Sequence, residues 1–311
     1  MSELILHHYA SSPFSEKVRL VLGLKGLAWR SVDVPVMMPK PDVLPLTGGY
    51  RRTPFLQIGA DVYCDSLLMC RVIDRLAPQP PLYPASCSGA APVLSQWADS
   101  ALFWVAVPLT IQLGGPLGIF PQQSPEFLKA FAADRAAMTA GLRRPAAHDA
   151  RATLLNYLGW LEQQLGDGRR YVLGADPCIA DVSIAQAIWF MQLSPKVAQQ
   201  LLAPYPKLGS WYGRVAAFGH GQPSELSSGA ALQVSAQATA HAPCAVDATL
   251  GFEAGAQVTV NALDYGADPV AGRLVGLSLD EVVLQRDDPR VGRVHVHFPR
   301  IGYQIKAERK D

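Results

Sequence analysis

Two serines and a proline separate a short apolar run from a helical pattern near the beginning of the chain. Residues 4–6 could form a strand, and apolar residues recur from Phe14 at the spacing of one helical face. Ser12 directly precedes Pro13, which predicts Ser12 as the N-cap and Pro13 as the first helical residue. A hydroxyl here can cap the helix, which stabilises by about 1 kcal/mol, or can donate a hydrogen bond to a bound group.

Two further polar pairs stand where predicted elements begin. Thr53 directly precedes Pro54. Because a residue before proline is biased towards extended backbone, this pair is expected at the start of a strand. Asp65 and Ser66 stand at the start of a helical pattern. The three polar signals therefore come in a fixed order, each at the beginning of a helix or a strand.

The elements that would position these residues are of three kinds along the chain. Residues 1–79 follow the order β-α-β and then β-β-α, which is a thioredoxin-like α/β layout. Residues 90–220 carry helical periodicity and predict an all-α bundle. Runs such as "LQVSAQA" and "RVHVHF" predict a small all-β barrel or sandwich over residues 229–311. Two stretches rich in proline, glycine and serine read as linkers between the three parts.

Composition narrows the class of protein. The chain has 311 residues, of which 49% are hydrophobic and 17% charged, as in folded globular proteins. A net charge of +1 offers no electrostatic reason to expect nucleic acid or an anionic membrane as a partner. Five scattered cysteines without a C-x-x-C pair favour reduced thiols. With no pattern typical of a signal peptide or a membrane span, we expect a cytoplasmic protein.

Four motifs, taken together and in this order, resemble the cytosolic glutathione transferases. They are "SPFSEKVRLVLGLKG", "RRTPFLQIG", "YCDSLLMCRVIDRL" and, in the helical part, "IADVSIA". The resemblance covers residues 1–220 and implies an enzyme with glutathione as co-substrate, working as a homodimer built by the first two parts. "SPFS" looks like a C-P-x-C motif with both sulfurs replaced, which implies a serine-type or omega-like bacterial branch.

The resemblance also assigns roles to individual residues. The family's catalytic residue sits at the turn into the first helix, and Ser12 matches that place. Pro54 matches the family's cis-proline, whose preceding residue, Thr53, offers its backbone to the cysteinyl part of glutathione. Asp65 and Ser66 match the acidic-Ser pair that holds the γ-glutamyl end. The implied glutathione-binding residues are Ser12, Phe14, Arg52, Thr53, Pro54, Asp65 and Ser66.

The physical chemistry agrees with these roles. A helix N-terminus has free N–H groups and partial positive charge, so Ser66 could bind a carboxylate there while Asp65 pairs an ammonium. Lowering a thiol pKa from about 8.5 by about two units requires about 2.7 kcal/mol. One hydrogen bond to a charged group supplies about 1.5–3 kcal/mol and a helix N-terminus about 0.3–1 kcal/mol, so the Ser12 hydroxyl suffices. Ser11, Ser15 and Tyr9 remain alternative thiol activators.

Three functional hypotheses follow. The first is a glutathione transferase that attacks a small, largely apolar electrophile. The second is a non-catalytic binding or scaffolding protein, and the third is a glutathione-dependent thiol oxidoreductase, against which the serines at both cysteine places argue. Arg51 and Arg52 could reach a glutathione carboxylate or form a solvated basic pair.

The region after residue 229 offers no catalytic cluster in the sequence. His295 and His297 share a predicted strand face, but two ligands without a third make a poor zinc site, so we expect no metal. We therefore expect an independently folded accessory domain. Removing it near Ser227 is expected to leave glutathione binding within a few-fold of that of the intact protein.

Overall fold

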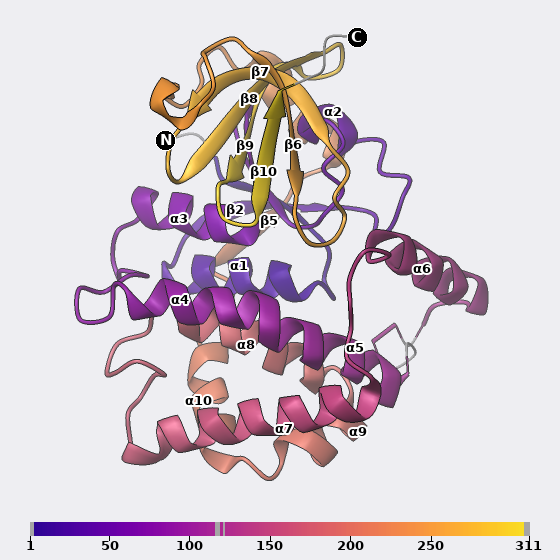
Figure 1. The fold of residues 1–311 in the computed structure, drawn as a ribbon, viewed down its shortest axis with the longest axis vertical. Coiled ribbons are helices and arrows are strands. Elements are labelled where there is room, and N and C mark those ends of the chain that lie inside the picture. Colours follow the sequence, from indigo (N-terminus) through magenta and orange to yellow (C-terminus); the bar gives the residue numbers. More distant parts are fainter. Residues whose placement is uncertain (1–2, 116–118, 121, 308–311) are drawn as a thin grey trace.

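The structure is a computed structural model that describes residues 3–115, 119–120 and 122–307. Figure 1 shows a strand-rich part above a set of helices, with α1 and α3 between them. The first part has the predicted thioredoxin-like order. Its elements are β1 (Ile5–His8), α1 (Pro13–Leu24), β2 (Ala28–Asp33), α2 (Leu44–Thr47), β3 (Phe55–Ile58), β4 (Asp61–Cys64) and α3 (Ser66–Leu76). Strand β1 runs parallel to β2 and antiparallel to β3, and β4 runs antiparallel to β3.

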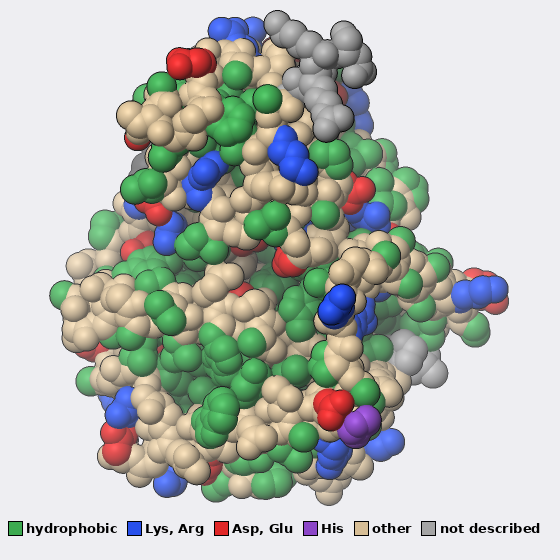
Figure 2. Space-filling model, in the orientation of Figure 1, with side chains coloured by type: hydrophobic (Ala, Val, Ile, Leu, Met, Phe, Trp, Pro, Cys, Tyr) green, Lys and Arg blue, Asp and Glu red, His purple; other side chains and the backbone are tan. Residues whose placement is uncertain are grey.

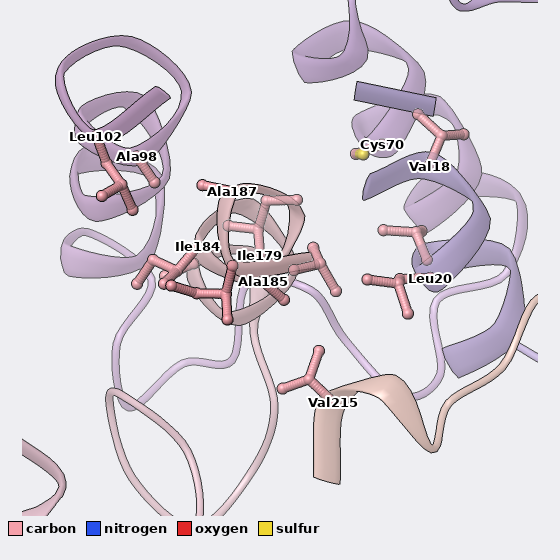
Figure 3. Close-up of a cluster of buried hydrophobic side chains, with 14 of the residues drawn as sticks. Val18, Leu20, Cys70, Ala98, Leu102, Ile179, Ile184, Ala185, Ala187 and Val215 are labelled. Carbon is pink, nitrogen blue, oxygen red and sulfur yellow. The ribbon is translucent and has the colours of Figure 1, made fainter. Parts of the chain in front are cut away.

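The second part is helical, as predicted. Its longer elements are α4 (Ala90–Trp97), α5 (Phe103–Gly114), α6 (Pro125–Met138), α7 (Ala147–Gln164), α8 (Ile179–Gln192) and α10 (Pro206–Ala216), with a π-helical turn (Ala98–Leu102) joining α4 to α5 and a short helix α9 (Pro195–Val197). Helix α8 is the central element, because almost all of its side chains are buried. Figure 3 shows Ile184 and Ala187 of α8 between Leu102 on one side and Val18 of α1 on the other. This shared core holds the helical part against the first part.

The last part contains β5 (Gln222–Glu225), α11 (Ser228–Gln237), β6 (Gln257–Ala262), β7 (Val270–Leu277), β8 (Glu281–Asp288), β9 (Gly292–Pro299) and β10 (Tyr303–Ala307). The strand-rich C-terminal region predicted from the sequence is therefore present. Two local predictions were wrong. Residues 232–237, expected as strand, lie in α11, because Ser227 caps that helix and Ala231, Leu232 and Ser235 bury one helical face. Residues 222–225, expected as linker, form β5, which pairs with β2.

The C-terminal strands are not independent of the first part, and on this point the sequence-based expectation was wrong. The ten strands in the described part of the chain form one sheet in the order β10-β6-β7-β8-β9-β4-β3-β1-β2-β5. Strand β9 pairs in parallel with β4, with Val62 opposite Val296. Phe55 and Phe298 lie in one buried cluster that spans the join. The edge of β4 is thus covered by a strand that follows it by more than 200 residues, and edge pairing over such a separation leaves no local signal in a sequence.

Candidate functional site

Two adjoining pockets lie where the three parts of the chain meet. Figure 2 shows the surface hollowed between the C-terminal strands and the helices below them. The first, here called the apolar pocket, has about 930 Å³ of empty space out to its open mouth. Its aromatic lining consists of Tyr9, Phe14, Phe103, Trp104, Phe120, Phe131, Phe190 and Tyr265. The second, here called the polar pocket, is lined by residues that include Thr53, Pro54, Asp65, Ser66, Gln96, Asp99, Ser100 and Tyr303. The two pockets share a wall made of Phe14, Arg52, Thr53 and Tyr265.

Ser12 lies at the N-terminus of α1 and lines the apolar pocket beside this shared wall. Its Oγ accepts a hydrogen bond from the Ser15 N–H at 3.2 Å, so Ser12 caps the helix as predicted. The hydroxyl also points to the carbonyl oxygen of Thr53 at 3.5 Å, which is the long limit of a hydrogen bond. The cap therefore uses a lone pair of Oγ, while its hydrogen is only weakly engaged and can be redirected to a ligand.

The alternative activators differ in their access to the pockets. Tyr9 and Ser11 line the apolar pocket together with Ser12. Ser15 is fully buried, and its Oγ has no hydrogen-bond partner among the residues that the structure describes. Ser15 is not among the lining residues of either pocket. The geometry thus leaves Ser12, Ser11 and Tyr9 as groups that a molecule in the apolar pocket could touch.

Thr53 and Pro54 lie on the loop before β3, and their peptide bond is cis. Thr53 faces both pockets, and its Oγ1 accepts a hydrogen bond from the Nζ of Lys40 at 2.9 Å. Lys40 was missed in the sequence, because it lies in an irregular proline-rich passage with no pattern around it. Burial, together with nearby Arg135, lowers the pKa of Lys40 to about 7. A lysine that titrates near neutral pH therefore stands at the wall of the apolar pocket.

Asp65 and Ser66 open α3 at the polar pocket, as predicted. Asp65 Oδ1 accepts the Leu67 N–H at 2.9 Å and caps the helix. Its Oδ2 accepts a hydrogen bond from the Tyr303 hydroxyl, 3.1 Å away on β10. Among the described residues Asp65 alone, glycines aside, has a positive φ, 73°. Such backbone strain costs on the order of 1–3 kcal/mol and is concentrated at ligand sites.

Arg52 forms part of the shared wall and is held by the C-terminal part of the chain. Its guanidinium donates to the carboxylate of Asp264 and to the carbonyl oxygen of Tyr265. It also lies over the Tyr265 ring, 3.9 Å from the ring centroid. The neighbouring Arg51 pairs instead with Asp134 of α6. The site therefore depends on Tyr265, Asp264 and Tyr303, which sequence reasoning could not connect to it because they lie in the region the motifs do not cover.

A buried ion pair stands behind the polar pocket. Lys17 of α1 is fully buried, and its Nζ lies 2.5 Å from Oδ2 of Asp99, which lines the pocket. Burial by itself lowers the pKa of Lys17, but the Asp99 carboxylate outweighs it and raises this pKa to about 12. Asp99 also accepts a hydrogen bond from Gln186 of α8 at 3.0 Å. The pair thus orients a carboxylate at the pocket and joins the first part to the helices.

Comparisons with known proteins agree with this architecture. Residues 6–81 match the model of the glutathione S-transferase N-terminal domain, and residues 130–214 match that of the C-terminal domain. A structure of a GST-like protein from Pseudomonas syringae is 40% identical, with a TM-score of 0.81, and the match covers 99% of this chain and all of that one. The match therefore includes the C-terminal strands.

More distant structures share the fold alone. A glutathione S-transferase from Rhodospirillum rubrum is 18% identical with a TM-score of 0.53, over 69% of this chain and 88% of that one. Glutathione S-transferase III in its apo form is 22% identical with a TM-score of 0.52, over 78% of this chain and all of that one. A search of curated proteins gave no significant match. Within the described residues no helix has both the length and the apolar character needed to cross a membrane.

Proposed function

We propose that this chain, which belongs to the glutathione S-transferase family, is a serine-type transferase that activates the glutathione thiol with Ser12. The proposal rests on one observation. The apolar and polar pockets share a wall, and Ser12 stands beside that wall at a helix N-terminus. A thiol held at the wall would meet the Ser12 hydroxyl, while a second reactant would lie in the apolar pocket.

The polar pocket offers groups for the two ends of the γ-glutamyl unit. Ser66 and the first free N–H groups of α3 can bind its carboxylate, because a helix N-terminus favours an anion. The carboxylates of Asp65 and Asp99 face the same pocket and can pair its ammonium. The backbone of Thr53 can bind the cysteinyl part of glutathione, and Arg52 forms part of the wall of the pocket. Each of these residues except Asp99 was predicted as a glutathione contact.

The Ser12 hydroxyl can stabilise the thiolate as a donor, without acting as a base. Because the helix cap uses only an acceptor lone pair of Oγ, the hydroxyl hydrogen can turn from the Thr53 carbonyl to the sulfur. The thiolate then attacks the electrophile, the new sulfur–carbon bond forms, and either a leaving group departs with its electron pair or an activated double bond takes up a proton. The aromatic lining of the apolar pocket favours a small apolar electrophile.

Replacing Ser12 by alanine tests this role. We expect Ser12→Ala to raise the pKa of the bound thiol and to lower kcat/KM about 10- to 100-fold, as for the loss of one hydrogen bond to a charged group. Glutathione affinity should change only a few-fold. The measurements are an ultraviolet titration of the bound thiolate, turnover of a chromogenic electrophile, and calorimetry.

A matched control separates this role from helix capping. Ser124→Ala removes the same type of cap, since Ser124 precedes Pro125 and accepts the Phe127 N–H at 3.2 Å on α6. It should leave the thiol pKa unchanged. If Ser12→Ala and Ser124→Ala behave alike, Ser12 is only a cap. Glutathione binding without turnover of any electrophile would favour the scaffolding hypothesis, and disulfide reduction by the unmodified protein would favour the oxidoreductase.

Lys40 predicts a pH dependence of ligand binding. With its pKa near 7, Lys40 is charged at pH 6 and largely neutral at pH 8.5, so an anionic ligand beside it should bind more weakly as the pH rises. We expect the affinity for S-methylglutathione, which has no ionisable thiol, to fall about 5-fold over this range. In Lys40→Met the affinity should be lower at pH 6 and should fall less between pH 6 and pH 8.5 than in the wild type, because only the α-ammonium of the ligand still titrates. A Lys40→Met profile with the wild-type slope would contradict this.

The homodimer remains a prediction that only the family resemblance supports.

A further inference from the structure

A second cluster of polar side chains lies at the seam between β4 and the C-terminal strands. It comprises Asp61 at the start of β4, His295 on β9 and His241 in the segment between α11 and β6. The pairing of β4 with β9 sets Asp61 directly opposite His295. The residues that line the two pockets do not include any of the three. The inference drawn from this cluster is therefore independent of the proposed function.

Three ligand atoms converge in this cluster. The Nδ1 atoms of His241 and His295 lie 3.6 and 3.8 Å from Oδ1 of Asp61. One possible ligand atom from each of the three residues lies within 4.8 Å of the other two. These separations are too long for hydrogen bonds. Both Nδ1 atoms are buried and have no hydrogen-bond partner within the described part of the chain. Two unpaired buried nitrogens beside one carboxylate need a further group to satisfy them.

The separations suit a transition metal. Zinc bonds of about 2.0–2.2 Å to nitrogen and oxygen, at tetrahedral or trigonal angles, place neighbouring donor atoms about 3.3–3.8 Å apart. The His241 and His295 rings stack at 3.7 Å between centroids, with 16° between their planes, so the partly exposed His241 ring must rotate for both Nδ1 lone pairs to point at one ion.

The groups around the cluster hold Asp61 in place. Oδ1 of Asp61 accepts a hydrogen bond from His297 Nε2 at 2.8 Å, and Oδ2 accepts the Ala242 N–H at 2.9 Å. The other ring nitrogen of His297 lies 2.5 Å from a carboxylate oxygen of Glu281. An outer layer of hydrogen bonds that orients a ligand in this way is typical of metal sites.

We propose that Asp61, His241 and His295 bind one zinc ion. Two imidazole nitrogens and one carboxylate oxygen are a donor set that zinc accepts, whereas magnesium and calcium prefer oxygen alone. His241 is partly exposed, so water can occupy the fourth position. The ion would join β4, β9 and the segment before β6, and would thus clamp the C-terminal strands to the first part of the chain.

The test is a zinc titration of the full chain without a polyhistidine tag, after dialysis against a chelator. We expect calorimetry to give one zinc per chain with micromolar or tighter affinity, an increase in the melting temperature, and no binding of Mg²⁺. In ¹⁵N NMR spectra of the wild-type protein, zinc should shift the ring nitrogens of His241 and His295. About 100 μM zinc lies far above a micromolar dissociation constant, so absence of binding at this concentration would overturn the proposal. Chemical shift changes confined to other histidines would overturn it too.

Two variants locate the site. His241→Phe keeps a ring stacked on His295 but removes the ligand nitrogen, so it should lower zinc affinity at least about 100-fold, more than the loss of an outer-layer group. His148→Phe is the matched control, because His148 is an exposed histidine beside an aspartate, outside the cluster. It should bind zinc like the wild type. Unchanged zinc affinity in His241→Phe would overturn the assignment, whatever the outcome for glutathione.

Discussion

Deletion of residues 228–311 is expected to leave a chain that neither melts cooperatively nor binds glutathione. Without these residues β4 loses its partner β9 and becomes an exposed edge, and the first part loses the apolar side chains that cover it. An unpaired edge flanked by exposed apolar surface promotes aggregation. The site is damaged as well, because Arg52 loses Asp264 and Tyr265, and Asp65 loses the hydroxyl of Tyr303.

Circular dichroism, thermal melting and calorimetry with glutathione measure this outcome.

A point variant in the full chain tests the same contact between β4 and β9. Val296→Asp places a carboxylate in the core opposite Val62 and should reproduce the loss of the cooperative melt. Leu279→Asp, at a side chain that is 79% exposed beside β8, should melt like the wild type. A truncated chain that melts cooperatively and binds glutathione within a few-fold of the intact protein would refute the dependence on β9.

Replacing Lys17 by methionine is expected to destabilise the protein by about 3–5 kcal/mol, the usual cost of removing one partner of a buried ion pair. The variant leaves the partly buried Asp99 carboxylate between α1 and α8 without its cation. The loss should appear in urea unfolding as a lower midpoint with an unchanged slope. Glutathione binding should weaken too, because Asp99 lines the polar pocket.

A solvent-exposed ion pair serves as the control for Lys17→Met. Arg293 pairs with Asp287 at 3.2 Å, with both side chains more than half exposed. Arg293→Met should therefore change the free energy of unfolding by no more than about 1 kcal/mol. The double variant Lys17→Met/Asp99→Leu removes both buried charges and should recover part of the loss. Equal effects of Lys17→Met and Arg293→Met would show that the buried pair contributes no special stability.

Sequence alone determined the elements whose signals are local. Ser12 before Pro13 predicted a helix start, and Ser12 caps α1 in the structure. Asp65 and Ser66 likewise open α3, and Thr53 and Pro54 directly precede β3, as expected from the proline. Such signals survive in a sequence because caps and proline effects act over three or four residues. The thioredoxin-like order and the helical part followed in the same way from the periodicity of apolar residues.

Only the tertiary structure decided what these elements share with distant parts of the chain. It set β9 against β4, brought Tyr265 and Tyr303 to the site, and placed Asp61 and His241 beside His295, a histidine that looked like half of an incomplete metal site in the sequence. Residues 232–237, expected as a strand, form part of helix α11, whose buried residues Ala231 and Leu232 pack in the same apolar cluster as residues of the sheet. Strand pairing and side-chain convergence depend on which edges and surfaces remain uncovered after local folding. That information belongs to the assembled chain and to no short stretch of it.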